Sequence, residues 1–248
     1  MCLFSGIAGF IDAVVGGGGL IQLPAILILM PGMPFPTLLG TNKFASMFGT
    51  SIAVYRYTRH VAVDWSTVIP ATVAAFVFAF LGSRVVSILN PAVLLPVILV
   101  LLIAVAIYVF FVKELGLIHQ PKHAAHKARW LGILVGAALG FYDGFFGPGS
   151  GSFLIFGFVG IFGFDFLSAS ASAKVVNLAA IIASVIYFAA TDQLLYGMGV
   201  AMAVCNIIGA TLGTHLAITK GSKFVRVFFL VIVTALIAKL AQTMWSGG

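Results

Sequence analysis

Long apolar runs separated by short polar turns fill most of the chain. The runs cover residues 3–30, 36–57, 65–88, 92–112, 130–162, 164–188, 194–218 and 222–243. Runs of this length predict helices, because in lipid a helix satisfies its backbone hydrogen bonds internally. The pattern therefore predicts an all-α integral membrane protein.

Composition supports this fold class. Hydrophobic residues make up 62% of the 248 residues and charged residues only 8%, whereas about 25% is charged in an ordinary soluble protein. The net charge of +7 comes from basic residues scattered over short turns. Because they form no polybasic domain, we expect no nucleic-acid partner.

The two halves of the sequence resemble each other at an offset of 131 residues. GFIDAVVGGGG, from Gly9, aligns without a gap with GFYDGFFGPGS, from Gly140. The identities pair Gly9, Phe10, Asp12, Gly16, Gly18, Gly32, Phe35 and Lys43 with Gly140, Phe141, Asp143, Gly147, Gly149, Gly163, Phe166 and Lys174. Internal repeats that keep costly intramembrane charges are typical of transporters.

We therefore interpret the chain as two homologous repeats of about four apolar segments each. Repeat one covers residues 1–112, a polar linker covers 113–129, and repeat two covers 130–248. Together they are expected to form a single transmembrane domain over residues 1–248.

The first apolar run of each repeat is too long for one crossing. A straight helix over residues 3–30 or 130–162 would span ~42 to 50 Å, against ~30 Å of hydrocarbon. Glycines interrupt the middle of each run, at Gly16–Gly19 and at Gly147–Gly151, where helix propensity is low. If the broken run still crosses, the repeats are parallel. If it is re-entrant, they are inverted.

The basic residues in the turns favour the re-entrant topology. With Lys43 and Lys174 taken as intramembrane, the spanning topology divides the basic residues seven to four. The re-entrant topology places Arg56, Arg59, Lys113, Lys122, Lys127, Arg129, Lys220, Lys223 and Arg226 on one side, and Arg84 and Lys239 on the other. Since basic turns favour the cytoplasm, both termini are expected outside and the linker inside.

The glycine breaks are candidate anion-binding sites. A helix that starts after a break exposes backbone N–H groups, whose partial positive charge favours an anion, and such half-helices are predicted to begin near Leu20 and Ser152. The candidate residues are Gly16, Gly17, Gly18, Gly19, Gly147, Gly149, Ser150 and Gly151. Alternatively, the glycines only permit close helix packing.

Each repeat also carries one acid and one lysine in apolar surroundings, 31 residues apart. These are Asp12 with Lys43, and Asp143 with Lys174. One interpretation is an ion pair that holds the broken helix to its neighbour. The other gives each lysine to a substrate anion and each aspartate a role as helix clamp or proton carrier.

Further polar residues share a helix face with the lysines. Ser46 follows Lys43 by three residues, Asn177 follows Lys174 by three, and Asn42 and Ser172 lie nearby. Their hydrogen-bonding groups suit the oxygens of an oxyanion. No metal-ligand spacing or cofactor motif accompanies them, so neither a metal nor a cofactor is expected.

These motifs resemble a known family. GFxD followed by GGGGL, and GFYDGFFGPGSGSF in the second half, are similar to the paired signatures of the sulfite exporter TauE/SafE family (TSUP), which includes 4-toluene sulfonate uptake permease-like transporters. The resemblance covers nearly the whole chain. It implies a carrier of small sulfur-containing anions such as sulfite, thiosulfate or sulfonates, in a cell membrane, with the bacterial inner membrane the expected one. The matching motif residues are Asp12, Gly16–Gly19, Lys43, Asp143, Gly147–Gly151 and Lys174.

We therefore expect a secondary transporter for a small anion, working by alternating access about a midplane site. A homodimer is compatible with the apolar surface. The alternatives are an anion channel, an intramembrane enzyme or a non-transporting membrane scaffold. An enzyme is disfavoured because the chain has neither HExxH nor a nucleophile elbow.

Overall fold

The computed structural model describes residues 1–30, 32–86 and 119–246, and every regular element in these ranges is a helix. The helices are α1 (Cys2–Val15), α2 (Gly19–Leu29), α3 (Phe35–His60), α4 (Trp65–Val86), α6 (Ala125–Phe145), α7 (Ser150–Gly160), α8 (Phe166–Ala190) and α9 (Tyr196–Ser246). The prediction of an all-α fold is confirmed for this part of the chain. The apolar run 92–112 and residues 113–118 of the predicted linker lie outside the described residues.

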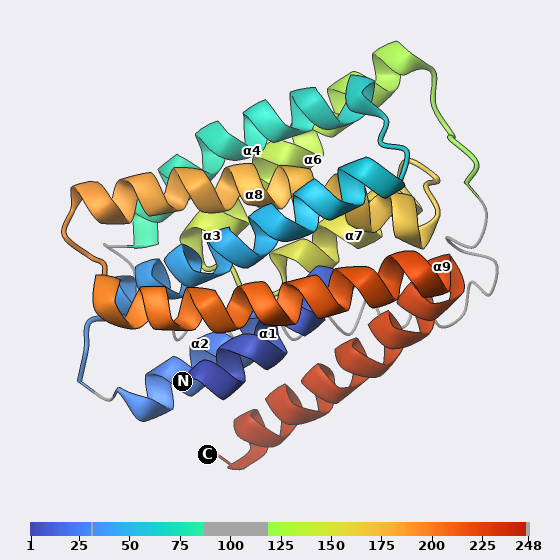
Figure 1. The fold of residues 1–248 in the computed structure, drawn as a ribbon. Coiled ribbons are helices and arrows are strands. Elements are labelled where there is room, and N and C mark those ends of the chain that lie inside the picture. The colour runs from blue at the N-terminus through green and yellow to red at the C-terminus, as the bar shows by residue number, and fades with distance from the viewer. Residues whose placement is uncertain (31, 87–118, 247–248) are drawn as a thin grey trace.

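The first apolar run of each half is a hairpin of two helices. α1 ends at Val15 before the glycines and α2 follows them, and α6 and α7 are divided in the same way. Figure 1 shows that the second helix of each hairpin runs back along the first. At the open end of the second hairpin, Lys122 Nζ donates to the carbonyl of Gly160 at 2.7 Å. The predicted breaks are present, and the chain reverses direction at each.

Three predicted boundaries differ from the observed ones by a few residues. The helices after the breaks begin at Gly19 and Ser150 rather than near Leu20 and Ser152. α6 already begins at Ala125, so residues 125–129 of the predicted linker are helical. Helix ends are the part of an element that sequence patterns define least well, because the terminal turn is fixed by local caps and packing.

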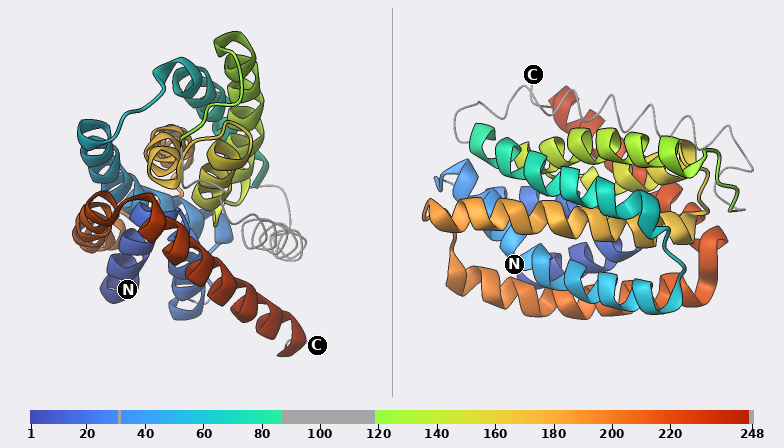
Figure 2. Two further views of the ribbon diagram at one scale, coloured as in Figure 1. Left: turned by 90° about the vertical axis from the view of Figure 1, so that its right-hand side faces the viewer. Right: turned by 90° about the horizontal axis from the view of Figure 1, so that it is seen from above.

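The longer helices lie around these hairpins. Among them, α9 turns at Gly221, whose φ of +72° is non-helical. The turn divides α9 into arms over residues 196–220 and 222–246, which diverge in Figure 2. These arms correspond to the predicted runs 194–218 and 222–243.

Glycines allow two pairs of helices to pack backbone to backbone. Gly136 of α6 lies on α4, where an added Cβ would be 2.2 Å from the carbonyl oxygen of Ala71. Gly209 of α9 lies on α1 in a similar way, 1.9 Å from the carbonyl oxygen of Gly6. Small residues at such contacts are how membrane helices gain van der Waals packing.

The helix starts recur at the offset seen in the sequence. The first residues of α2, α3 and α4 lie 131 residues before those of α7, α8 and α9, which pairs Gly19 with Ser150, Phe35 with Phe166, and Trp65 with Tyr196. Corresponding helices run in opposite directions in Figure 1. This is the arrangement that the inverted interpretation expects, while the duplication itself stays a prediction.

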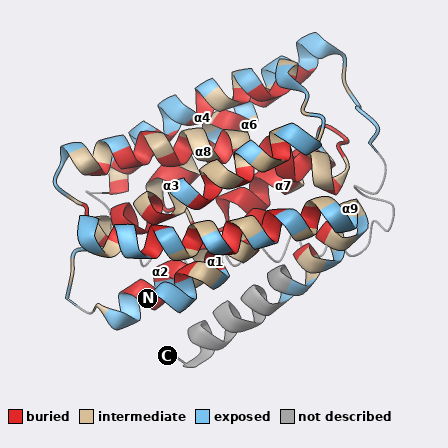
Figure 3. Ribbon diagram, viewed as in Figure 1, coloured by how far each residue is buried: buried red, intermediate tan, exposed pale blue. Residues whose placement is uncertain are grey.

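The molecule buries several ionisable groups and exposes many apolar ones. Lys43, Lys174 and Asp143 are at most 3% exposed, whereas Leu134 and Leu212 on outer faces are 64% and 59% exposed. Figure 3 shows the exposed residues on the outside of the helices. Among the described residues, three stretches are long and apolar enough to cross a membrane: Trp65–Val86, Phe166–Ala190 and Tyr196–Val231. An apolar exterior around a polar centre is expected of a membrane protein.

Candidate functional site

The two glycine breaks meet at the centre of the molecule. Gly16, at the end of α1, has a φ of +76°, and a Cβ there would lie 2.3 Å from the carbonyl carbon of Gly151 in α7. Only glycine combines this backbone conformation with so close an approach. Ser152 Oγ donates to the carbonyl oxygen of Val15 at 2.7 Å, which satisfies one of the carbonyl groups at the end of α1. Both halves therefore contribute to one central structure.

Two buried ion pairs cross between the halves. Lys43 Nζ of α3 lies 2.8 Å from Asp143 Oδ2 of α6, with both side chains 4% exposed. Lys174 Nζ of α8 lies 2.6 Å from Asp12 Oδ2 of α1, where the lysine is 1% and the aspartate 19% exposed. Each lysine thus pairs with the acid of the other half. A buried ionic group of this kind is tolerated when it is paired.

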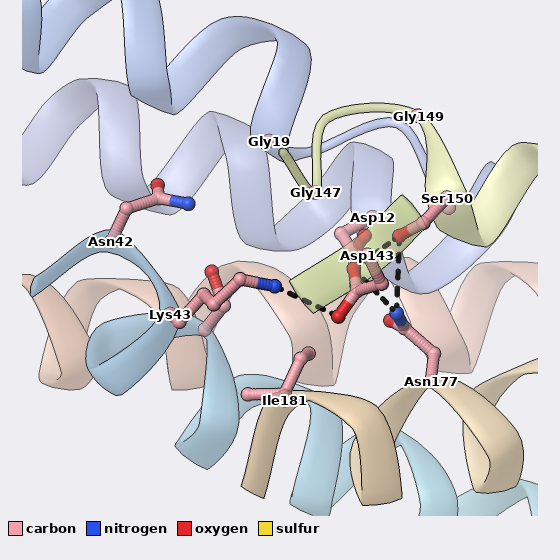
Figure 4. A pocket seen from close by; sticks show the side chains of 12 residues that line it. Asp12, Gly19, Asn42, Lys43, Asp143, Gly147, Gly149, Ser150, Asn177 and Ile181 are labelled. Carbon is pink, nitrogen blue, oxygen red and sulfur yellow. Dashed lines mark hydrogen bonds and ion pairs between the residues drawn. The ribbon is translucent and has the colours of Figure 1, made fainter. Parts of the chain in front are cut away.

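Asp143 is also held by two neutral groups through its second carboxylate oxygen. Ser150 Oγ of α7 donates to Asp143 Oδ1 at 2.5 Å. Asn177 Nδ2 of α8 lies 3.5 Å from the same oxygen and 3.3 Å from Ser150 Oγ. Figure 4 shows these three side chains converging beside Lys43. Helices from both halves therefore position the Asp143 carboxylate.

A pocket opens beside this cluster. It encloses about 360 Å³ of empty space, part of it in the open mouth, and is lined by Asp12, Gly16, Gly19, Asn42, Lys43, Ser46, Asp143, Gly147, Gly149, Ser150, Asn177 and Ile181. The ammonium of Lys43 lies against the second break, since a Cβ on Gly147 would be 3.2 Å from it. The lining combines a lysine, a carboxylate pair and small polar groups.

Asn42 adds an unsatisfied polar group to the pocket. Its side chain is 5% exposed, and among the described residues its Oδ1 is one of few buried side-chain atoms without a hydrogen-bond partner. Figure 4 shows Asn42 among the side chains that line the pocket. Because buried polar groups are nearly always hydrogen-bonded, this acceptor oxygen is a contact point for a water or for a donor group of a ligand.

The turns at the breaks use some of the N–H groups that the sequence assigned to an anion. Leu20 and Ile21 donate to the carbonyls of Gly17 and Gly18 at 3.1 Å, and Ser150 donates to that of Gly147 at 3.0 Å. Anion binding by the backbone at these helix starts therefore stays a prediction. The side-chain donors of Lys43 and Asn177 are the better-placed groups.

Most of the predicted site residues come together in the pocket, and some do not. The pocket lining leaves out Gly17, Gly18, Gly151, Ser172 and Lys174. Ser172 Oγ instead donates to the carbonyl of Ser168 in its own helix, at 2.8 Å. Lys174 lies outside the lining and pairs with Asp12, which lines the pocket.

Sequence reasoning missed two positions that the structure brings to the site. Ile181 lines the pocket, and Thr50 Oγ1 lies 3.4 Å from Asp12 Oδ2. Each follows its lysine by seven residues, which puts it two turns further along the same helix face. Helical spacing from Lys43 and Lys174 was the signal that could have found both.

Comparison with known proteins places this chain in a family. The family model "Sulfite exporter TauE/SafE" matches residues 1–240. The chain belongs to this family. A TauE/SafE relative from Haemophilus influenzae, called "Probable membrane transporter protein", is 35% identical over 94% of this chain and 90% of its own length. No solved structure matches the chain significantly.

Two further TauE/SafE relatives carry similar names. "Probable membrane transporter protein ORF9" of Sinorhizobium sp is 34% identical, and "Probable membrane transporter protein YfcA" of Escherichia coli strain K12 is 31% identical. Both alignments cover 94% of this chain, with 88% and 86% of the relatives. Family and relatives together identify this TauE/SafE protein as a membrane transporter.

Proposed function

We propose that this TauE/SafE protein is a multi-pass secondary transporter, in a bacterial inner membrane, for a small sulfur-containing oxyanion such as sulfite, thiosulfate or a sulfonate. The observation that supports this most directly is Lys43, a buried ammonium that lines a pocket where two broken helices meet. The proposal that the anion contains sulfur rests on the name of the family, which refers to sulfite export.

The donors in the pocket suit an oxyanion. Lys43 has three N–H donors, and Asn177 and Ser46 add an amide and a hydroxyl from two different helices. A small oxyanion presents several acceptor oxygens that such converging donors satisfy. Hydrogen bonds from a charged donor to an anion are the strong ones, and they offset the loss of the anion's hydration.

The architecture supports alternating access. The pocket lies between two hairpins of opposite direction, and its lining residues come from both halves. A rocking motion of one half against the other would expose this pocket first on one side and then on the other. The site itself would stay near the middle of the membrane.

The test is transport by purified protein in proteoliposomes, with sulfite, thiosulfate and methanesulfonate as probes. Lys43→Ala should lower the initial rate at least about tenfold, because a hydrogen bond to a charged group is worth ~1.5–3 kcal/mol. Lys223→Ala is the matched control, since Lys223 is an exposed lysine outside the pocket. It should transport like the unaltered protein.

The same assay separates the alternatives. Unchanged transport in Lys43→Ala would contradict the proposed site. Flux that rises linearly with concentration, with no saturation, would indicate a channel instead. Lys174→Ala tests the sequence prediction that both lysines contact the anion. If that prediction is right, Lys174→Ala should lose as much transport as Lys43→Ala.

A further inference from the structure

The ionic groups at the site balance one another. Among the described residues, the site holds Lys43, Lys174, Asp12 and Asp143, and the two ion pairs use all four. The cluster is therefore neutral as it stands. An anion that enters adds a negative charge to a centre whose lysines are already engaged.

Lys43 is the lysine that an anion can reach. It lines the pocket, whereas Lys174 is 1% exposed and lies outside the lining. If the anion binds the ammonium of Lys43, it competes with Asp143. The contact between Lys43 Nζ and Asp143 Oδ2 must then break or be shared with the anion. Asp143, at 3% exposure, would then be a buried carboxylate without its cation, which is strongly unfavourable.

We propose that Asp143 takes up a proton from solvent each time an anion displaces it from Lys43, so that the anion and the proton cross together. This rests on the proposed function. The proton adds to the carboxylate as its ionic contact breaks, no other covalent bond changes, and no electron is transferred. With a singly charged anion such as methanesulfonate bound, the centre then keeps its neutral charge.

The surroundings of Asp143 can accommodate both protonation states. Ser150 Oγ donates to the carboxylate and can equally accept from a carboxylic acid, because a hydroxyl does both. Asn177 can donate in either state. The neighbouring Tyr142 is occupied, since its hydroxyl donates to the carbonyl of Pro148 at 2.8 Å. Around Asp143, the described charged groups are therefore Lys43 on α3 and the Asp12–Lys174 pair across the pocket.

The second ion pair has a different role in this scheme. Asp12 Oδ2 keeps Lys174 at 2.6 Å and also lies 3.4 Å from Thr50 Oγ1. Asp12 lines the pocket but Lys174 does not, so an anion that binds Lys43 leaves the ammonium of Lys174 on Asp12 and this pair stays intact. Asp12–Lys174 then holds the first break to α8 and takes up no proton.

The experiment measures protons taken up as an anion binds. Purified protein in weakly buffered solution with a pH indicator is titrated with thiosulfate or methanesulfonate, which are anions of strong acids and stay ionised throughout. Any proton taken up therefore goes to the protein. We expect about one proton per bound anion, and an affinity that falls up to about tenfold for each unit of rising pH.

Three variants test whether Asp143 is the group that takes up the proton. Asp143→Asn should still bind the anion, with no proton uptake and an affinity independent of pH. Asp12→Asn should weaken anion binding, because the first break loses its ion pair with Lys174. The number of protons taken up per bound anion should stay the same. Asp64→Asn removes a carboxylate of the α3–α4 turn, which is not part of the pocket lining, and should change neither quantity.

The possible results separate this inference from the proposed function. Anion binding without proton uptake in the unaltered protein would overturn the coupling and leave an anion transporter. Equal proton uptake in Asp143→Asn and the unaltered protein would also overturn it. Binding of none of the probe anions would overturn the proposed function and this inference together.

Discussion

At the scale of single residues, Gly16 and Gly32 have similar backbone conformations and different surroundings. Their φ angles are +76° and +93°. A Cβ on Gly16 would overlap the backbone of Gly151, whereas a Cβ on Gly32 would have nothing within 4 Å. The two positions therefore separate the cost of backbone strain from the cost of forcing the breaks apart.

Gly16→Ala should destabilise the protein about twice as much as Gly32→Ala. The strained φ alone costs of order 1–3 kcal/mol, and overlap with the second break adds typically 1–3 kcal/mol at Gly16. Thermal unfolding of the two purified variants in detergent measures the difference. Equal midpoints would show that the breaks are not in close contact.

The identity of the ionic residues could be predicted from the sequence, and their pairing could not. The equal 31-residue spacing of Asp12 to Lys43 and of Asp143 to Lys174 suggests pairs within each half. The structure pairs each lysine with the acid of the other half. Spacing along the chain does not report which break faces which helix, because that depends on how the two halves dock.

At the scale of elements, Asp165 fixes the start of α8. Its side chain accepts hydrogen bonds from the backbone N–H groups of Leu167 and Ser168 at 2.9 and 3.1 Å. Ser222 Oγ, next to the turn in α9, donates to it at 2.5 Å. Burial raises the pKa of this carboxyl, but the hydrogen bonds from Ser168, Ser222 and Leu167 outweigh it and hold the pKa below its ordinary value.

Asp165→Ala should therefore destabilise the protein at neutral pH, by about 1 kcal/mol for the lost helix cap. The lowered pKa means that the carboxylate stabilises the fold fully above its ordinary value of ~3.9 and progressively less as pH falls below it. Unfolding midpoints measured from neutral to acid pH should converge. A gap that stays constant into acid would contradict a role for the charged form.

Four regularly spaced glycines of α6 form a close helix contact whose partner the sequence did not identify. Gly132, Gly136, Gly140 and Gly144 recur every four residues, which puts them on one helix face. The structure packs this face on α4 through the backbone from Thr67 to Ala79. The spacing predicts a close helix contact, but the partner helix depends on the fold of the whole chain. The two helix breaks, in contrast, could be predicted, because glycines lower helix propensity at their own positions whatever the rest of the chain does.

At the scale of the whole molecule, the two ends of the helix bundle carry different turns. Residue 124 precedes α6 at the end where Gln120 pairs with Gly163 through the backbone, at 2.9 Å. Thr191 follows α8 at the other end. Since α8 runs from one end to the other, these two positions should lie on opposite sides of the membrane.

Ala124→Cys should be labelled by an impermeant thiol reagent only from the cytoplasmic side, and Thr191→Cys only from outside. Both residues are exposed. The background needs Cys2 and Cys205 replaced, because both are free thiols. Labelling of Ala124→Cys in intact cells would reverse the predicted orientation. Labelling of both positions from one side would contradict the crossing.

The crossed ion pairs also bear on how such a molecule could be assembled from pieces. If the chain were cut in the linker, each fragment would keep one acid and one lysine inside lipid without their partners. Neither fragment would be stable alone, while the two together could restore both pairs by complementation. A single half that inserted in both orientations would form the same two pairs with a second copy of itself. One acid and one lysine would then have sufficed for a dual-topology ancestor.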